Sequence, residues 1–313
     1  AAFPSLASRQ MISRIFLCLA LTHVAAAPRL ASAAVPAPPD TFEVATLKDR
    51  AETVAFFHHD PMSPLATILR EDVPRAGWLT IGAAADNQVV LADSGIAAHH
   101  ARVRIDGPGF HVESVDPGAT FRVKGEAKSE ANVPPSTIGI GRYSVRLSYQ
   151  NAPAVIVFDP RIPRAGEFAG PTYWPYDRKY RFVVPLALES KADTVLIEST
   201  GGQPRPALRV GRFAFKLGGK NVKLAAFRLL EPGVGNDDVS LFYMDATCGH
   251  GSYHGGRYVN VEKQADGRYL VDFNNGYNPS CSYSPHYNCP IPPLENRLTV
   301  KIPAGESWSE EGH

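Results

Sequence analysis

The stretch GWLTIGAAADNQVVLADSGIAAHHARVRI, residues 77–105, begins a long region whose residue pattern is typical of short β-strands. Runs of β-branched and aliphatic residues alternate in it with Gly, Asp and Asn, which turns prefer. The same pattern continues to the C-terminus, and the 313 residues include 26 Gly and 27 Pro. We therefore expect a mainly β protein, with two β-sandwich or barrel-like units after a short N-terminal helical segment.

The segment before residue 77 has helical spacing instead. Thr41 is the predicted cap of a helix with apolar residues at Phe42, Val44 and Leu47. A second short helix is predicted at Ser63-Pro64, because Ser caps helices and Pro suits their first turn.

Strands are predicted wherever a short apolar run lies between turn residues. In the first unit they are residues 78–81, 89–91, 101–105, 110–115, 120–123, 144–149 and 155–158. In the second unit they are residues 181–188, 194–198, 212–216, 222–229, 239–244, 257–261, 269–273 and 298–302.

The chain divides into five predicted segments. They are residues 1–33 as upstream residues and a signal peptide, 34–40 as a Pro-rich leader, 41–76 as the helical segment, 77–160 as the first β unit and 161–313 as the second. A loop rich in Pro, Gly and aromatic residues separates the two β units.

The N-terminal residues have the pattern of an export signal. Met11 and Arg14 precede an apolar run that closes on Ala31-Ser-Ala33, a small-x-small cleavage pattern. The apolar run is too short and interrupted to span a bilayer comfortably. We expect an exported bacterial protein, periplasmic or secreted, with no membrane span after cleavage.

Charge and motifs exclude two function classes. The formal net charge is +1, and Lys and Arg are scattered rather than clustered, which argues against a nucleic-acid binder. No Gly-x-Ser-x-Gly elbow is present, which argues against a serine hydrolase of that kind.

The first β unit resembles forkhead-associated (FHA) domains. The spacing of Trp78–Gly82, Asn87–Leu91 and His99–Val103 is similar to that of this family, an eleven-stranded β-sandwich that binds phosphothreonine through its loops. Gly82 and His100 match, but alanines stand at the positions of the phosphate-binding Arg and Ser, Ala83 and Ala97, and a nearby Asn is missing. Alanine offers no charge-assisted donor to a phosphate. We expect the shape without phosphopeptide binding, and His100 as a structural residue.

The second unit resembles the family DUF1684, a domain of unknown function. The resemblance lies in Phe242–Thr247, Tyr253–Tyr258, Val271–Cys281, Cys289–Leu298 and Ala304–Glu306, with Pro171–Tyr180 before them. The family name implies no chemistry. Gly251 departs from the pattern where an acidic residue is expected, and His254 departs where Gly is expected.

A polar run from Asp245 to Glu306 contains the candidate functional residues. Strand alternation puts Asp272 and Asn274 on one face, and these two could converge with Asp245, two arginines and two glutamates. The predicted ligand-binding residues are Asp245, Tyr253, Arg257, Asp272, Asn274, Tyr277, Asn278, Glu295 and Arg297. Loop aromatics beside them, including Tyr173 and Tyr283, suit either stacking on a ligand or covering the core.

Several chemistries are open to these residues. The oxygens of Asp245, Asp272 and Asn274 suit Ca²⁺ rather than a transition metal. Asp245, Asp272 and Glu295 are the candidate catalytic acids and bases of a hydrolase. Arg257 and Arg297 could instead bind a ligand carboxylate in a fork. The alternative to all of these is that Asp, Asn and Arg stabilise turns and pin loops to the sheet.

Cysteine and histidine suggest two further features. Cys248, His250 and His254 have a spacing that zinc could use, although no second-shell carboxylate is evident. Cys281 and Cys289, flanked by prolines, form the natural disulfide pair in an oxidising compartment.

The leading hypothesis from the sequence is a binding module that holds a small polar ligand, a sugar, peptide or carboxylate, in the second β unit. One alternative is a hydrolase that uses Asp245 and Asp272 as acid and base. The other is a structural or partner-docking protein of the cell envelope.

Overall fold

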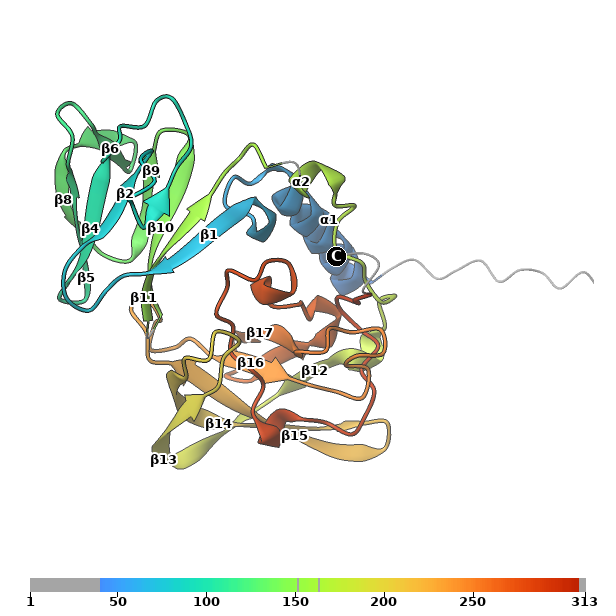
Figure 1. The fold of residues 1–313 in the computed structure, drawn as a ribbon. Helices are drawn as coiled ribbons and strands as arrows, with labels where there is room; N and C mark the ends of the chain where they lie inside the picture. The colour runs from blue at the N-terminus through green and yellow to red at the C-terminus, as the bar shows by residue number, and fades with distance from the viewer. Residues whose placement is uncertain (1–39, 151, 163, 310–313) are drawn as a thin grey trace, which may run out of the picture. The chain divides into compact units, whose positions relative to one another are not determined.

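The computed structural model describes residues 40–150, 152–162 and 164–309. The predicted signal peptide, and all of the leader except residue 40, lie outside the described residues. The protein is mainly β, as predicted, with one long helix and three sheets (Figure 1). Among the described residues, no helix is both long enough and apolar enough to cross a membrane.

Helix α1 comprises Thr41–His59. Its cap is Asp40 rather than the predicted Thr41, because the Asp40 carboxylate accepts a hydrogen bond from the backbone N–H of Glu43 at 2.7 Å. Only Thr46 and Phe57 of this helix are buried.

The predicted helical segment ends earlier than residue 76. Ser63 starts a single 3-10 turn, Pro64–Ala66, and strand β1, Thr67–Asp72, follows directly. The β-branched residues that open β1 favour extended backbone, and β1 pairs antiparallel with β11, Ala152–Phe158, far along the chain. Tertiary pairing therefore overrides the local helical pattern here.

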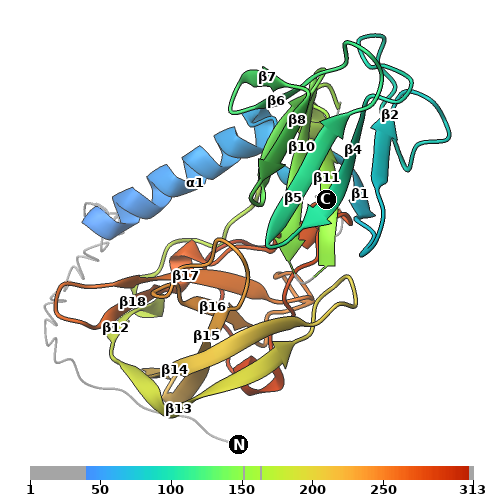
Figure 2. The ribbon, with the colours of Figure 1, turned by 90° about the vertical axis from the view of Figure 1, so that its left-hand side faces the viewer.

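The first β unit is a sandwich of two sheets (Figure 2). One sheet has the order β1-β11-β10-β9-β6-β7 and the other the order β3-β2-β4-β5-β8. Their facing apolar side chains, among them Ile81, Phe110 and Val145, form one core. The other bounds are β2 Leu79–Gly82, β3 Val89–Val90, β4 Ala101–Asp106, β5 Gly109–Ser114, β6 Phe121–Val123, β7 Glu126–Lys128, β8 Glu130–Val133, β9 Ser136–Ile140 and β10 Tyr143–Gln150.

His100 stabilises the loops at one end of this sandwich. Its ring is buried, Nδ1 accepts from the Ala97 backbone N–H at 3.1 Å, and Nε2 lies 3.0 Å from the Thr120 carbonyl. With Nδ1 as acceptor, Nε2 carries the proton and donates. Both ring nitrogens are thus used within the fold, in agreement with the structural role predicted for His100.

The second β unit is one seven-stranded antiparallel sheet of order β12-β18-β17-β16-β15-β14-β13. The sheet is rolled, so that β12 and β14 come together although four strands separate them in the sheet order. Phe182 of β12 stacks on Phe215 of β14 with ring centroids 4.3 Å apart. Within the described residues β12 and β13 remain its edges, so it does not close into a barrel. The bounds are β12 Arg181–Val184, β13 Leu186–Ile197, β14 Arg205–Leu217, β15 Lys220–Leu229, β16 Ser240–Tyr243, β17 Arg257–Lys263 and β18 Tyr269–Asp272.

Two strand predictions in this unit are corrected. The predicted strand 181–188 is split at Pro185, which has no N–H to give to a ladder. The predicted strand 298–302 is irregular, because the Ile302 N–H donates to the Asp245 carboxylate at 2.6 Å instead of to a neighbouring strand.

Asn296 links strands that are poorly paired. The only paired residues of β15 and β16 are Phe227 and Ser240. The Asn296 side chain bridges these strands: it accepts from the Ala225 N–H at 2.7 Å and donates to the carbonyls of Ala225, at 2.9 Å, and Phe242, at 2.7 Å. A buried amide thus completes a ladder that the backbone leaves open.

Gly82 provides a test of the sandwich. A Cβ at this position would lie 2.1 Å from the Ala98 carbonyl oxygen, which also accepts from the Asn87 side chain. We expect Gly82→Ala to lower the free energy of unfolding by about 3 kcal/mol in urea titrations. Gly166→Ala, where a Cβ meets nothing within 4 Å, is the control and should change it by less than about 1 kcal/mol. Equal effects would contradict the packing described here.

Candidate ligand site

A pocket of about 650 Å³ lies between helix α1 and the loops that follow β18. It is the size of a small-molecule site. Its polar wall comes from the loop Asn274–Asn278 and from Glu306, and its aromatic wall from Tyr173, Tyr283 and the end of α1. The charged and aromatic side chains that line it are Lys48, Asp49, Arg50, Glu52, Phe56, Phe57, Tyr173, Glu262, Tyr277, Tyr283 and Glu306.

Glu306 is the buried acid of this pocket and is only 3% exposed. One carboxylate oxygen accepts from the Asn278 backbone N–H at 2.7 Å and from the Tyr283 hydroxyl at 2.8 Å. Burial raises the pKa of Glu306 to about 7, although these hydrogen bonds and the charges of Arg257 and Arg50 oppose the rise. A buried carboxyl with a raised pKa at the wall of a pocket is a candidate functional group.

Arg50 fixes α1 against the loop. Its guanidinium donates to the carbonyls of Trp174 and Asn274, both at 3.0 Å, and lies over the Tyr173 ring at 4.6 Å. One turn earlier, the Thr46 hydroxyl donates to the Asn275 side chain at 2.9 Å.

A group of aromatic rings completes the attachment at the other end of the helix. Phe57 packs on Tyr283 with ring centroids 4.5 Å apart, and on Phe168 at 5.4 Å. The helix therefore forms one wall of the pocket through polar contacts at one end and aromatic contacts at the other.

Asp272 and Asn274 support the pocket from behind. Asp272 accepts from the backbone N–H of Asn274 at 3.0 Å and from its side-chain amide at 2.9 Å, and so caps the 3-10 turn Phe273–Asn275. The Asn274 side chain also bonds both backbone groups of Asp177. Burial raises the pKa of Asp272. These contacts are the turn-stabilising kind that the sequence left open as an alternative.

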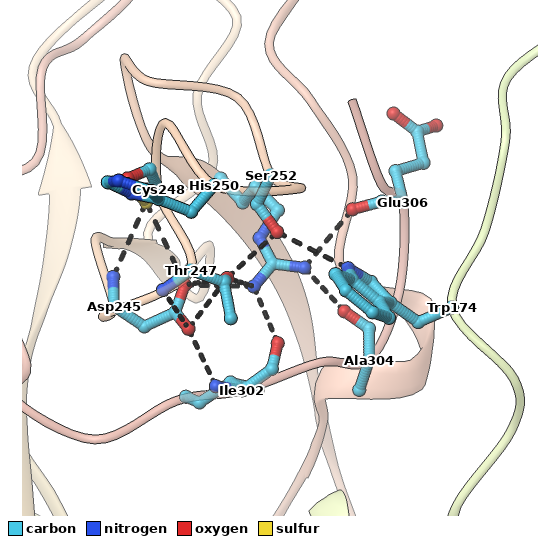
Figure 3. A network of polar contacts seen from close by, with 10 residues as sticks. Trp174, Asp245, Thr247, Cys248, His250, Ser252, Ile302, Ala304 and Glu306 are labelled. Atoms are coloured by element: carbon cyan, nitrogen blue, oxygen red, sulfur yellow. Dashed lines mark hydrogen bonds and ion pairs between the residues drawn. The ribbon is translucent and has the colours of Figure 1, made fainter. Parts of the chain in front are cut away.

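Asp245 and Arg257 form a separate, fully buried ion pair at 2.9 Å, with neither side chain exposed. Arg257 also donates to the backbone carbonyls of Ile302, Ala304 and Glu306, and Asp245 accepts from Thr247 and the Ile302 N–H. In Figure 3 the Glu306 side chain points away from Asp245. Neither Asp245 nor Arg257 lines the pocket.

The remaining predicted residues are dispersed. Glu295 binds Arg209 and Arg212 in a partly exposed cluster. Arg297 is exposed beside Met244. The Tyr277 hydroxyl donates to the Asn260 side chain at 3.1 Å.

The structure thus brings Asn274, Tyr277 and Asn278 into one pocket with Glu306, with Asp272 behind them. It does not bring Asp245, Arg257, Glu295 or Arg297 there. Helix α1 was not among the predicted site elements, although its charged residues Lys48, Asp49 and Arg50 line the pocket and are recognisable in the sequence.

The candidate metal ligands do not assemble. The Cys248 thiol contacts Asp245, the His250 ring is 3.2 Å from the Cys248 carbonyl, and His254 packs on Tyr253. Asp245 and Asp272, the carboxylates considered for Ca²⁺, belong to separate networks. Across the described part of the chain, no three His, Cys, Asp or Glu side chains are grouped so that they could hold a metal ion.

Two sequence features near these groups acquire a structural description. Cys281 and Cys289 are free thiols, so the predicted disulfide is not formed in this structure.

Gly251, the departure from the family pattern, has a φ of 101°, and a Cβ there would lie 2.9 Å from the Trp174 ring. A side chain at position 251 therefore requires Trp174 to move.

Comparisons with known proteins agree with the resemblance of the second unit to DUF1684. Residues 166–307 match the family model described as a protein of unknown function, DUF1684. An uncharacterised protein of Haloarcula marismortui, solved by NMR, is 30% identical over 49% of this chain and 84% of its own, with a TM-score of 0.40.

FHA domains are also among the similar solved structures. An FHA domain studied for phosphothreonine-dependent interactions is 20% identical over 26% of this chain and 78% of its own, with a TM-score of 0.21. Mycobacterium tuberculosis EmbR, solved with a low-affinity phosphopeptide, is 19% identical over 38% of this chain and 32% of its own, also at 0.21. A search of curated proteins gave no match.

The Asp245–Arg257 pair predicts a large stability effect. Asp245→Asn leaves a buried guanidinium without its counter-charge, so the free energy of unfolding should fall by about 3–5 kcal/mol in urea titrations. Asp266→Asn breaks the exposed pair with Arg268, whose side chains are 50% and 52% exposed, and should cost no more than about 1 kcal/mol. Similar losses of unfolding free energy in both variants would show that burial does not determine how much the Asp245–Arg257 pair stabilises the fold.

Glu306 predicts a pH dependence of stability. Its folded pKa lies above the ordinary value of 4.5, so the native state holds the proton more tightly than the unfolded state. This contribution is complete below that ordinary value and is lost as the pH rises through about 7. Between about pH 5 and about pH 8 the wild type should lose about 2–3 kcal/mol more than Glu306→Gln.

The matched control for this pH effect is Glu262→Gln, which removes an exposed carboxylate that also lines the pocket. Its dependence on pH should parallel that of the wild type. If Glu306→Gln followed the wild type as well, the buried carboxyl would not be the titrating group.

Proposed function

The chain belongs to the DUF1684 family, whose description names no activity, and from the geometry we propose that it is a sugar-binding module with its site in the pocket between α1 and the second β unit. The observation that carries the proposal is the buried Glu306 carboxyl, hydrogen-bonded to Tyr283 and Asn278 at the wall of a cavity of ligand size. The signal-like N-terminal sequence supports placing this module in the periplasm or outside the cell.

The charges of the lining favour a neutral or cationic ligand. Four acidic side chains, Asp49, Glu52, Glu262 and Glu306, line the pocket against Lys48 and Arg50. Both terminal nitrogens of Arg50 already donate to a carbonyl, and its Nε has no partner among the described residues, so the acidic excess of the lining rather than Arg50 sets the charge that a ligand meets. Among the ligand classes expected from the sequence, this argues against a carboxylate.

The aromatic lining favours a sugar among the remaining ligands. Tyr173 and Tyr277 are half-buried and lie beside amide groups of the loop Asn274–Asn278. Rings supply an apolar face for the C–H groups of a sugar, and amides and carboxyls bond to its hydroxyls. An amino sugar would in addition pair its ammonium group with ionised Glu306.

The alternative of a hydrolase that uses Asp245 and Asp272 has less support. Asp245 is enclosed by Arg257, Thr247 and the Ile302 N–H, which leaves it no access to a substrate. Asp272 accepts two hydrogen bonds from Asn274 behind the pocket wall. General acid–base catalysis requires the group to reach the reacting proton, and neither carboxylate does so here.

A matched set of three sugars tests the proposal. Glucosamine, glucose and glucuronate share a pyranose ring but carry positive, zero and negative charge. Ligand-detected NMR with the purified chain should show binding in the order glucosamine, glucose, glucuronate, because acidic groups dominate the lining. Glucuronate as the strongest of the three would overturn the charge argument, and no binding by any would overturn the sugar assignment.

Two tryptophan substitutions on the same helix locate the site. Ala45 is exposed and lines the pocket, so Ala45→Trp should fill it and weaken sugar binding at least about tenfold, or about 1.4 kcal/mol. Ala51 is exposed but does not line the pocket, and Ala51→Trp should bind as the wild type does. Equal binding by both variants would place the sugar elsewhere.

A further inference from the structure

Cys281 and Cys289 lie against each other in the loop that follows the pocket segment. They are eight residues apart, and the Cys281 backbone N–H donates to the Cys289 sulfur at 3.3 Å. Their thiols also bond to each other, and both are free in this structure. Because the two thiols are hydrogen-bonded to each other, they are placed to form a disulfide.

The two thiols have different surroundings. Cys281 is partly exposed, whereas Cys289 is only 7% exposed. Hydrogen bonds from the Cys289 thiol and the Tyr253 hydroxyl lower the pKa of Cys281 against the effect of burial. Donation to Cys281, together with burial, raises the pKa of Cys289. Cys281 is therefore the more exposed residue of the pair, and Cys289 is the buried one.

We propose that Cys281 and Cys289 are a thiol–disulfide exchange site for small disulfides, in which Cys281 is the attacking thiol and Cys289 resolves the mixed disulfide. Tyr253, one of the residues that the sequence suggested for ligand binding, acts here as a positioning residue whose hydroxyl donates to the Cys281 sulfur.

The exchange proceeds in two balanced steps. The Cys281 thiolate attacks one sulfur of the small disulfide, forms a mixed disulfide and releases one thiolate. Cys289 then loses its proton to solvent and attacks the Cys281 sulfur, so that the mixed bond breaks and the second thiolate leaves. The protein pair is oxidised by two electrons, and the small disulfide is reduced to two thiols. The pair thus needs no oxidant other than the disulfide itself.

Cys248 is an internal control in the same chain. Its thiol is also partly buried, but it donates to the Asp245 carboxylate at 3.7 Å. Burial raises the pKa of Cys248, and within the described residues no other cysteine lies beside it to resolve a mixed disulfide. Exposure alone would not separate Cys248 from Cys281, whereas the hydrogen-bond pattern does.

Glutathione disulfide is the probe. The reduced full-length chain is incubated with it, blocked with an alkylating agent and mapped by mass spectrometry without reduction. The wild type should give a peptide pair linked between Cys281 and Cys289, with Cys248 alkylated. Cys289→Ser should accumulate a glutathionyl adduct on Cys281, whereas Cys281→Ser should react at Cys289 at least tenfold more slowly.

Three outcomes would overturn the proposal. They are a wild-type chain in which Cys281 and Cys289 remain alkylated, an adduct on Cys248 that forms as fast as the one on Cys281, and equal reaction of the two serine variants. The wild-type map requires no substitution, so a variant that fails to fold does not affect it. Tyr253→Phe adds a readout for positioning: the adduct should form more slowly, and the pH profile of the reaction should move to higher pH.

Discussion

The buried guanidinium of Arg257 is the constraint on which the candidate site depends. A charge with no exposed surface requires a counter-charge and several acceptors, and Asp245 and three carbonyls of the segment 302–306 provide them. Strand β17 is thereby tied to the last described segment of the chain. Glu306 belongs to that segment. Arg257 donates to the backbone carbonyl of Glu306, whereas the Glu306 side chain points away from Asp245 (Figure 3). The pair that the sequence suggested as a binding group thus positions the backbone of Glu306, which lines the pocket.

Strands could be predicted from the sequence where neighbouring residues alone determine them. Alternation and turn residues located most strands of both units. Local patterns could not show that β1 pairs with β11, or that the Asp245 carboxylate replaces a strand partner at Ile302. Both depend on contacts between distant parts of the chain, which a single sequence does not reveal.

The same distinction explains the site. Asn274, Tyr277 and Asn278 are neighbours in sequence, so any prediction that included one of them included the pocket wall. Glu295 and Arg297 belong to the same polar run, yet Glu295 pairs with Arg209 and Arg212 and Arg297 lies beside Met244. Only the position of α1, fixed by Arg50 and Phe57, separates a cavity wall from a solvent-exposed cluster. Polar composition therefore identified candidates, and long-range packing selected among them.

The shallow attachment of α1 has a consequence for the kinetics of the pocket. The helix buries only Thr46 and Phe57 of its 19 residues, whereas β16 buries three of its four residues and β17 three of its seven. Regions with few buried contacts open at a lower free energy than the global unfolding of the protein. Amide protons of α1 should thus exchange through local detachment while those of the central strands remain protected. Because α1 forms one wall of the pocket, its local detachment would open the pocket without disturbing the sheet.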